Sequence, residues 1–186
     1  MRIDHHKREA FSPIRSEAEL EAWLLHQEQL DRLLLRPVRG LGIRGTMHAV
    51  LRKPDGRIFA YRKDNGIVNN GFSFIANSIG NRAAAGATTA MGWIAVGTGT
   101  TAFAATQAEL VTELVRQAAT FSHTTGTKVF TLSTTFAAGV ATGTLTEAGV
   151  FNQSTLGGTM LDRVVFTGIA KAAADTLTQT FTFTMT

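Results

Sequence analysis

The stretch LTQTFTFTMT, residues 177–186, decides the fold of this chain. Its apolar residues, Phe181 and Phe183 among them, fall on every second position, and threonines fill the positions between them. Because successive side chains of a strand point to opposite faces, this period of two predicts a strand with one apolar face and one β-branched polar face. Residues 129–136, VFTLSTTF, alternate in the same way. The sequence therefore predicts a mainly β fold.

A hairpin and several further strands extend this prediction. Pro54-Asp55-Gly56 supplies the backbone dihedral angles of a tight turn between a strand that starts near residue 45 and a strand over 57–62. A short buried strand at 93–96 runs into a Gly-rich turn at 97–101. Short strands at this spacing predict a jelly-roll-like β-sandwich. The other strands are expected at 141–146, 149–152 and 160–169.

A first short helix is expected after the hairpin. Asp64-Asn65-Gly66 has the composition of a turn, so we expect it to end the second hairpin strand, with Asp64 as a turn residue like Asp55. Phe72, Ile75 and Ile79 then recur at helical spacing. Residues 82–92 are small and show no period, which predicts a mobile loop.

A second short helix is expected from Thr106, because Thr106 and Glu109 have the spacing of a capping box. This helix would continue through Leu114. Glu113 and Arg116 would then lie one helical turn apart, at a spacing that suits an internal ion pair.

Charge divides the chain into two parts. Residues 1–64 contain 13 Lys or Arg and 9 Asp or Glu, which is 22 of the 32 charged side chains, and residues 65–186 contain five of each sign. The whole formal charge of +4 therefore comes from the first part. We interpret residues 1–40 as an N-terminal arm and residues 41–186 as a β-rich body.

The arm is predicted to contain an amphipathic helix over about residues 16–35. Ser16 and Glu19 form a capping-box signature at its start, and Pro37 and Gly40 follow its end. One interpretation is that its apolar stripe packs on the chain's own domain; the other is that the stripe docks on a neighbouring subunit. The residues of this candidate docking stripe are Leu20, Trp23, Leu24, Leu30 and Leu34.

Composition excludes several classes of protein and site. Cysteine is absent, so the chain has neither disulfides nor thiolate metal ligands. Outside the adjacent tail pair His5 and His6, no two histidines have metal-ligand spacing, so we expect no metal and no cofactor. The chain shows neither a signal peptide nor an apolar run long enough to cross a membrane, which predicts a protein made in the cytoplasm.

Enzymatic and nucleic-acid-binding functions are both disfavoured. The Gly-rich turn at 97–101 lacks the lysine and the following helix of a phosphate-binding loop. Glu147, His123 and Asp162 are the one acid–base set that could serve a catalytic site, and nothing in the sequence predicts that they meet. Basic residues of the arm alternate with acidic ones, whereas nucleic-acid-binding surfaces are denser in positive charge. We therefore expect no catalytic residues.

Five short motifs follow one another between residues 55 and 152. They are Asp55-Gly56, Asn65–Gly71 with Phe74-Ile75-Ala76, Ile94–Thr100, Leu110 with Glu113 and Arg116, and Thr146–Asn152. This succession resembles a broad group of structural proteins from tailed bacteriophages, from about residue 45 to the end of the chain. The helix of residues 16–35 is not part of the common pattern.

The resemblance implies a non-enzymatic virion component that assembles in many copies. We expect a homo-oligomer that also binds other virion proteins and is located in the virion. The leading hypothesis is a tail-associated accessory protein, such as a collar, baseplate or fibre-anchoring subunit. The alternative is a head decoration or cement protein. Glu113 with Arg116, and Glu147 near Asn152, would then fasten loops and strands inside the subunit.

Overall fold

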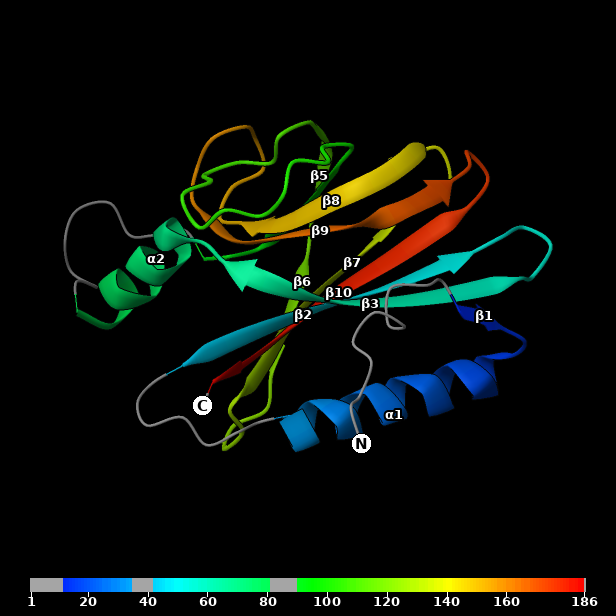
Figure 1. The fold of residues 1–186 in the computed structure, drawn as a ribbon, viewed down its shortest axis with the longest axis horizontal. Helices are drawn as coiled ribbons and strands as arrows, with labels where there is room; N and C mark the ends of the chain where they lie inside the picture. The colour runs from blue at the N-terminus through cyan, green and yellow to red at the C-terminus, as the bar shows by residue number, and fades with distance from the viewer. Residues whose placement is uncertain (1–11, 35–41, 81–89, 186) are drawn as a thin grey trace.

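The computed structural model describes residues 12–34, 42–80 and 90–185, and within these ranges the chain forms ten strands and two helices (Figure 1). Both helices and most strands fall where the sequence predicted them. The elements are β1 (Ser12–Ile14), α1 (Glu17–Leu34), β2 (Ile43–Arg52), β3 (Ile58–Ile67), α2 (Asn69–Gly80), β4 (Trp93–Gly97), β5 (Glu113–Ala118), β6 (Thr120–His123), β7 (Val129–Phe136), β8 (Gly143–Phe151), β9 (Met160–Lys171) and β10 (Thr176–Met185).

The strands form one nearly closed antiparallel sheet in the order β5-β4-β8-β9-β3-β2-β10-β7-β6, with β1 paired to β3. Only Ala119 separates β5, which pairs with β4, from β6, which pairs with β7. The two ends of the strand order are therefore neighbours along the chain. Hydrogen bonds from Gln117 to the Thr135 carbonyl (3.0 Å) and from Thr134 to the Ala118 carbonyl (2.8 Å) join β5 to β7.

Strand β3 changes its pairing partner along its length and so links the two halves of the sheet. It pairs with β2 as far as Asn65 and with β9 from Gly66 onward. The prediction that Asp64-Asn65-Gly66 ends the hairpin strand is therefore wrong, because the partner strands supply a ladder on either side of this point. Asp64 pairs with Arg44 and Arg62 instead of serving as a turn residue. An added Cβ at Gly66 would lie 2.3 Å from the Phe103 ring, so this ring would have to move to admit a larger residue.

The alternating sequence of β10 places every second side chain of this strand in the core. The apolar face of β10 is buried from Leu177 to Phe183, and Phe183 stacks on Phe130 of β7 with ring centroids 4.8 Å apart. Leu145 and Val150 of β8 belong to the same core cluster, so the strands of both halves of the sheet share one interior. The prediction of a mainly β fold is confirmed, whereas the sandwich and jelly-roll type is not confirmed by the nearly closed sheet.

Two local predictions are wrong. The helix expected from Thr106 is absent: residues 113–118 are strand β5, because the amides of Val111 and Thr112 bind the Glu147 carboxylate rather than helical carbonyls. The strands expected at 141–146 and 149–152 are one strand, β8, whose register shifts beside Thr146 where a bulge lets it continue. The loop expected at 82–92 lies mostly outside the described residues.

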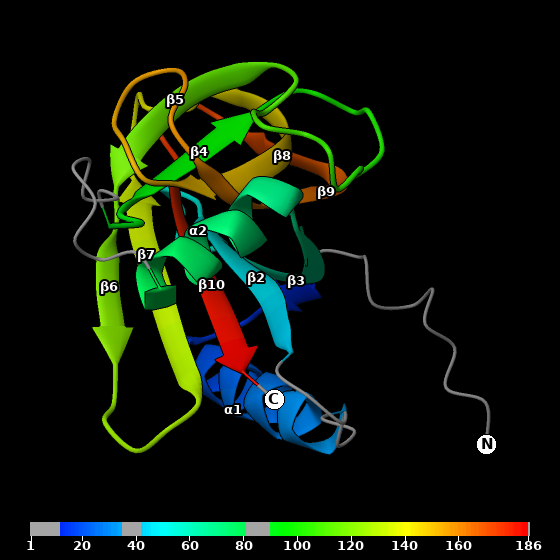
Figure 2. The ribbon, with the colours of Figure 1, turned by 90° about the vertical axis from the view of Figure 1, so that its left-hand side faces the viewer.

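Helix α1 covers the outer face of β2 and β3, on the side of the sheet away from β8 (Figure 1). One half of the predicted capping box is present, because the Ser16 hydroxyl accepts from the Glu19 amide (3.2 Å). The Glu19 carboxylate accepts from the Arg15 amide (2.7 Å) instead of the Ser16 amide. Leu20 is buried against Ile14, and Trp23 packs on the same cluster. Helix α2 lies across one end of the barrel (Figure 2).

Candidate functional site

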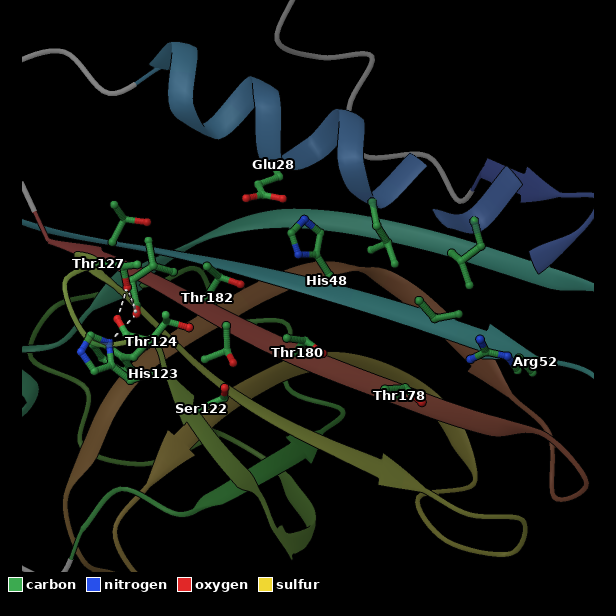
Figure 3. Close-up of a pocket in the computed structure, with 17 residues that line it drawn as sticks. Glu28, His48, Arg52, Ser122, His123, Thr124, Thr127, Thr178, Thr180 and Thr182 are labelled. Carbon is green, nitrogen blue, oxygen red and sulfur yellow. Dashed lines mark hydrogen bonds between the residues drawn. The ribbon is translucent and has the colours of Figure 1, made fainter. Parts of the chain in front are cut away.

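A groove of about 700 Å³ runs between α1 and the polar face of β10 (Figure 3). We call it the threonine groove. Four alternate threonines of β10 form its floor, α1 forms one wall, and the turn between β6 and β7 forms the other. Its lining residues are Leu20, Leu24, Glu28, His48, Val50, Arg52, Ser122, His123, Thr124, Thr127, Val129, Phe130, Thr131, Thr178, Thr180, Thr182 and Thr184.

Hydroxyl pairs across strands hold the floor of the groove. Ser133 of β7 lies 2.8 Å from the Thr180 hydroxyl, and Thr135 lies 2.9 Å from the Thr178 hydroxyl. Facing hydroxyl pairs of this kind add modestly to the stability of a sheet. They also leave the floor polar and without charge.

The two histidines of the groove differ in their surroundings. His48 lies under α1, where its ring meets Trp23 edge-on with centroids 5.7 Å apart. Burial, assisted by the nearby Arg62 charge, lowers the pKa of His48 to about 4, so its ring is neutral at pH 7. His123 lies on an exposed strand and its Nδ1 is 2.8 Å from the Val129 carbonyl. Figure 3 shows Glu28 projecting from α1 toward the groove.

From residue 65 onward, most charged residues point inward. Of the ten in residues 65–186, Arg82 lies outside the described residues, and Glu109 and Lys128 are exposed. The other seven are buried or held in ion pairs within the chain, so the described surface of this part is almost free of charge. These seven are Glu113, Arg116, Glu147, Asp162, Arg163, Lys171 and Asp175.

A fully buried ion pair joins Glu147 of β8 to Arg163 of β9. The Arg163 Nη2 donates to Glu147 Oε2 at 2.7 Å, and both side chains are 0% exposed. Burial by itself would raise the pKa of Glu147, but hydrogen bonds from the Thr112 amide and from Arg163 outweigh burial and hold that pKa below its usual value.

The same pair fastens the Gly-rich turn. The Gly99 amide donates to Glu147 Oε1 at 3.0 Å, and Arg163 donates to the Thr101 carbonyl at 3.0 Å and to Gln107 Oε1 at 2.9 Å. The turn at 97–101 therefore binds a carboxylate of its own chain. The Gly-rich turn therefore has a structural role: it binds the Glu147 carboxylate, and it lacks the lysine and the following helix of a phosphate-binding loop.

Glu113 and Arg116 form the predicted ion pair, with the Arg116 Nε 2.8 Å from Glu113 Oε1. Residues three apart on a regular strand point to opposite faces. Here Leu114 is an extra residue, because Val96 pairs with Val115 and Gly97 pairs with Glu113. This β-bulge places both side chains on one face.

The candidate docking stripe is divided by the fold. Leu20 and Trp23 pack on the sheet, as the own-domain interpretation expected, whereas Leu24 is 38% exposed and borders the threonine groove. Leu30 is half-buried, and the side chain of Leu34 lies outside the described residues. Docking by the exposed part of α1 stays a prediction.

The structure does not bring the possible acid–base set together. Glu147 and Asp162 lie on the neighbouring strands β8 and β9, but His123 lies on β6, next to β7. Asp162 is fully buried, accepts from the Val150 amide at 3.1 Å and contacts Asn65, and burial raises its pKa to about 8. Its carboxyl group is therefore part of the interior.

Sequence reasoning missed Arg163 and Leu156. Arg163 is one of five basic residues in residues 65–186, and this rarity was the signal that could have marked it as the partner of Glu147. Leu156, which is 72% exposed, lies in a polar loop and carries no periodic signal.

No protein-family model, no curated protein and no solved structure matches this chain. In the described ranges, no group of three or more acidic or histidine side chains could hold a metal ion. Neither of the helices described is both long enough and apolar enough to cross a membrane.

Proposed function

We propose that this chain is a non-enzymatic structural subunit of a tailed-phage virion, most simply a tail-associated accessory protein of the collar, baseplate or fibre-anchoring kind. The observation that carries the proposal is the nearly charge-free surface of the described residues from 65 onward, where most charges are used in internal contacts. Soluble monomers usually keep a surface of mixed charges that opposes close association. A neutral surface rich in threonine lets identical or different subunits pack without burying unpaired charges.

We also propose that the fold is a jelly-roll-like sandwich and that the N-terminal arm docks on a partner. Docking through the arm is supported by two exposed apolar residues of α1: Leu24, which is 38% exposed and borders the threonine groove, and Leu25, which is 61% exposed. An amphipathic helix with such residues can lie in a groove of a partner. The expected partners are other virion proteins and other copies of this chain.

Binding to purified virion parts tests the proposal. The full chain should bind isolated tails, and the double variant Leu24→Glu/Leu25→Glu should bind them at least ~30-fold more weakly, because two apolar anchors are lost. Glu21→Lys, an exposed change on the same helix, is the matched control. Binding to empty capsids but not to tails would favour a head decoration protein. Binding to neither would contradict a virion role.

A further inference from the structure

Asn65 lies at the point where β3 changes its partner strand. Its backbone pairs with Gly45 of β2, and the next residue, Gly66, pairs with Arg163 of β9. The Asn65 side chain contacts the Asp162 carboxyl group of β9. We call this the crossover contact, because it connects the β2–β3 pair to β9 where β3 crosses between them.

The two side chains of the crossover contact are closely enclosed. An added Cβ on Gly45 would lie 2.4 Å from Asn65 Nδ2, so the amide is confined between β2 and Asp162. Asp162 is 0% exposed, and its Oδ1 accepts from the Val150 amide of β8 at 3.1 Å. Asp162 therefore binds β8 with one oxygen and Asn65 of β3 with the other, and the contact joins three strands.

The hydrogen-bonding groups of this pair favour a proton on Asp162. Among the described residues, Asn65 Oδ1 is a buried acceptor without a hydrogen-bond partner. An ionised carboxylate only accepts, whereas a protonated carboxyl group also has one donor, so an acid and an amide can bond in both directions. Burial raises the pKa of Asp162 to about 8, which leaves the carboxyl group protonated at pH 7.

Within the described part of the chain, no cation forms an ion pair with Asp162. Arg163 follows it on β9, so the Arg163 side chain points to the opposite face, where it pairs with Glu147 of β8 at 2.7 Å. Helix α2, which packs on β9, has no titratable side chain. The other titratable residues near the crossover are Arg44 of β2, Tyr61, Arg62, Lys63 and Asp64 of β3, and Glu109 of the loop before β5.

We propose that the crossover contact is a proton-dependent latch, in which Asp162 donates its proton to Asn65 Oδ1 and so holds the end of the β2–β3 pair on β9. When the latch opens, water reaches Asp162 and the proton leaves. Each opening therefore releases one proton, and the latch opens more easily as pH rises. The latch concerns local opening of the sheet and does not depend on the proposed function.

Amide hydrogen exchange at several pH values tests the latch. The reporter is the Val68 amide, which donates to the Leu161 carbonyl at 3.2 Å just beyond the crossover. Its protection factor in the wild type should fall ~10-fold for each pH unit between pH 5 and pH 7, because one proton is released on opening. Asp162→Asn should remove this dependence. Asp64→Asn is the matched control, since its carboxylate is 53% exposed beside Asn65, and it should keep the dependence.

Asn65→Leu removes the other partner of the latch. Leucine is similar in size to asparagine but accepts no hydrogen bond, so the protection factor of Val68 at pH 5 should fall at least ~10-fold. Circular dichroism shows whether this variant is folded, and the comparison of wild type with Asp162→Asn tests the latch without it.

Three results would each overturn the proposal. The first is a wild-type protection factor of Val68 that does not change with pH. The second is a folded Asn65→Leu variant that protects Val68 as well as the wild type does. The third is equal protection of Val68 and of the amides of β7, because global unfolding would then be the event that exposes Asp162.

Discussion

The first third of the molecule and the β body use charge in opposite ways. In residues 12–64 most ion pairs have solvent-exposed partners: Arg57 and Asp55 have side chains 67% and 52% exposed, although Arg62 is only 7% exposed in its pair with Asp64. In the body, Arg163 and Glu147 are both 0% exposed, and Arg116 is 1% exposed. Solvated pairs contribute little to stability, whereas a buried pair, once formed, cannot lose one partner without leaving an unpaired interior charge.

This difference shows that most of the few charges in residues 65–186 stabilise internal contacts, which leaves the described surface of this part nearly free of charge. Each buried arginine fastens a loop to the sheet: Arg163 holds the loop that contains Thr101, and Arg116 holds the loop that contains Leu156. Four substitutions test this difference, and they follow from the largest expected effect on stability to the smallest.

Arg163→Met should cause the largest loss. It leaves Glu147 buried without its cation, which should lower the free energy of unfolding by ~3–5 kcal/mol. Urea denaturation followed by circular dichroism measures the change. Arg57→Met, which breaks the exposed pair with Asp55, should leave the denaturation midpoint where it is. Equal effects of the two variants would show that the contrast between the regions is false.

Arg116→Met should cost less overall, ~2–4 kcal/mol, because Glu113 lies nearer the surface and can regain water. Its effect should be concentrated in residues 153–157, whose carbonyls lose their donor. Hydrogen–deuterium exchange should rise in this loop more than in β8 or β9. An unchanged exchange rate in the loop would mean that Arg116 does not hold it.

Asp162→Asn should change how stability depends on pH. The pKa of Asp162 is raised from 3.8 to about 8 in the folded protein, so the folded state keeps a proton that the unfolded state has lost. The contribution of Asp162 to stability therefore falls as pH rises through this interval, by ~2 kcal/mol between pH 5.0 and 6.5. Asn lacks this titration.

His48 acts in the opposite sense over the same range, since its pKa falls from 6.5 to about 4 on folding. Its contribution is present above pH 6.5 and is lost as pH falls toward 4. The difference between wild type and Asp162→Asn at each pH removes the effect of His48. A difference that is constant with pH would contradict a buried, protonated Asp162.

Trp23→Ala should have the smallest effect, ~1–2 kcal/mol, because Trp23 is only partly buried against the outer face of the sheet. The body should stay folded, while water reaches His48 and its pKa rises from about 4 toward 6.5. NMR titration of the His48 ring measures this shift. If the whole melting transition disappears instead, α1 is part of the core and not an arm.

Local patterns predicted the elements that depend on neighbours in the sequence. The alternation ending at Met185, the Pro54-Asp55-Gly56 turn and the cap formed by Ser16 all lie where we expected them. The helix expected from Thr106 is absent because its capping signal was weaker than contacts from far along the chain: Glu147 binds the Thr112 amide, and β4 recruits residues 113–118 into the sheet. No window around residue 106 contains that information.

The candidate sites were less predictable than the fold. The Glu113–Arg116 pair was expected, but for a helical reason, and a β-bulge at Leu114 produces it instead. Trp23 could have faced a partner or its own sheet, and only the packed structure shows it against the sheet. Leu156 is conspicuous only because Arg116, 40 residues earlier, holds its loop in place.

The sequence predicts a β-rich chain whose charges are gathered in its first third and whose last strand has one apolar and one threonine face. These features follow from residue type and spacing, which act over a few residues. Three features appear only in the folded chain: Arg163 pairs with Glu147, β3 crosses from β2 to β9 at Gly66, and the threonine face borders a groove under α1. Each of these features depends on which distant segments fold against one another. The ion pair is an example: a buried charge needs a partner of opposite sign, and the local spacing of residues does not say which residue that partner is.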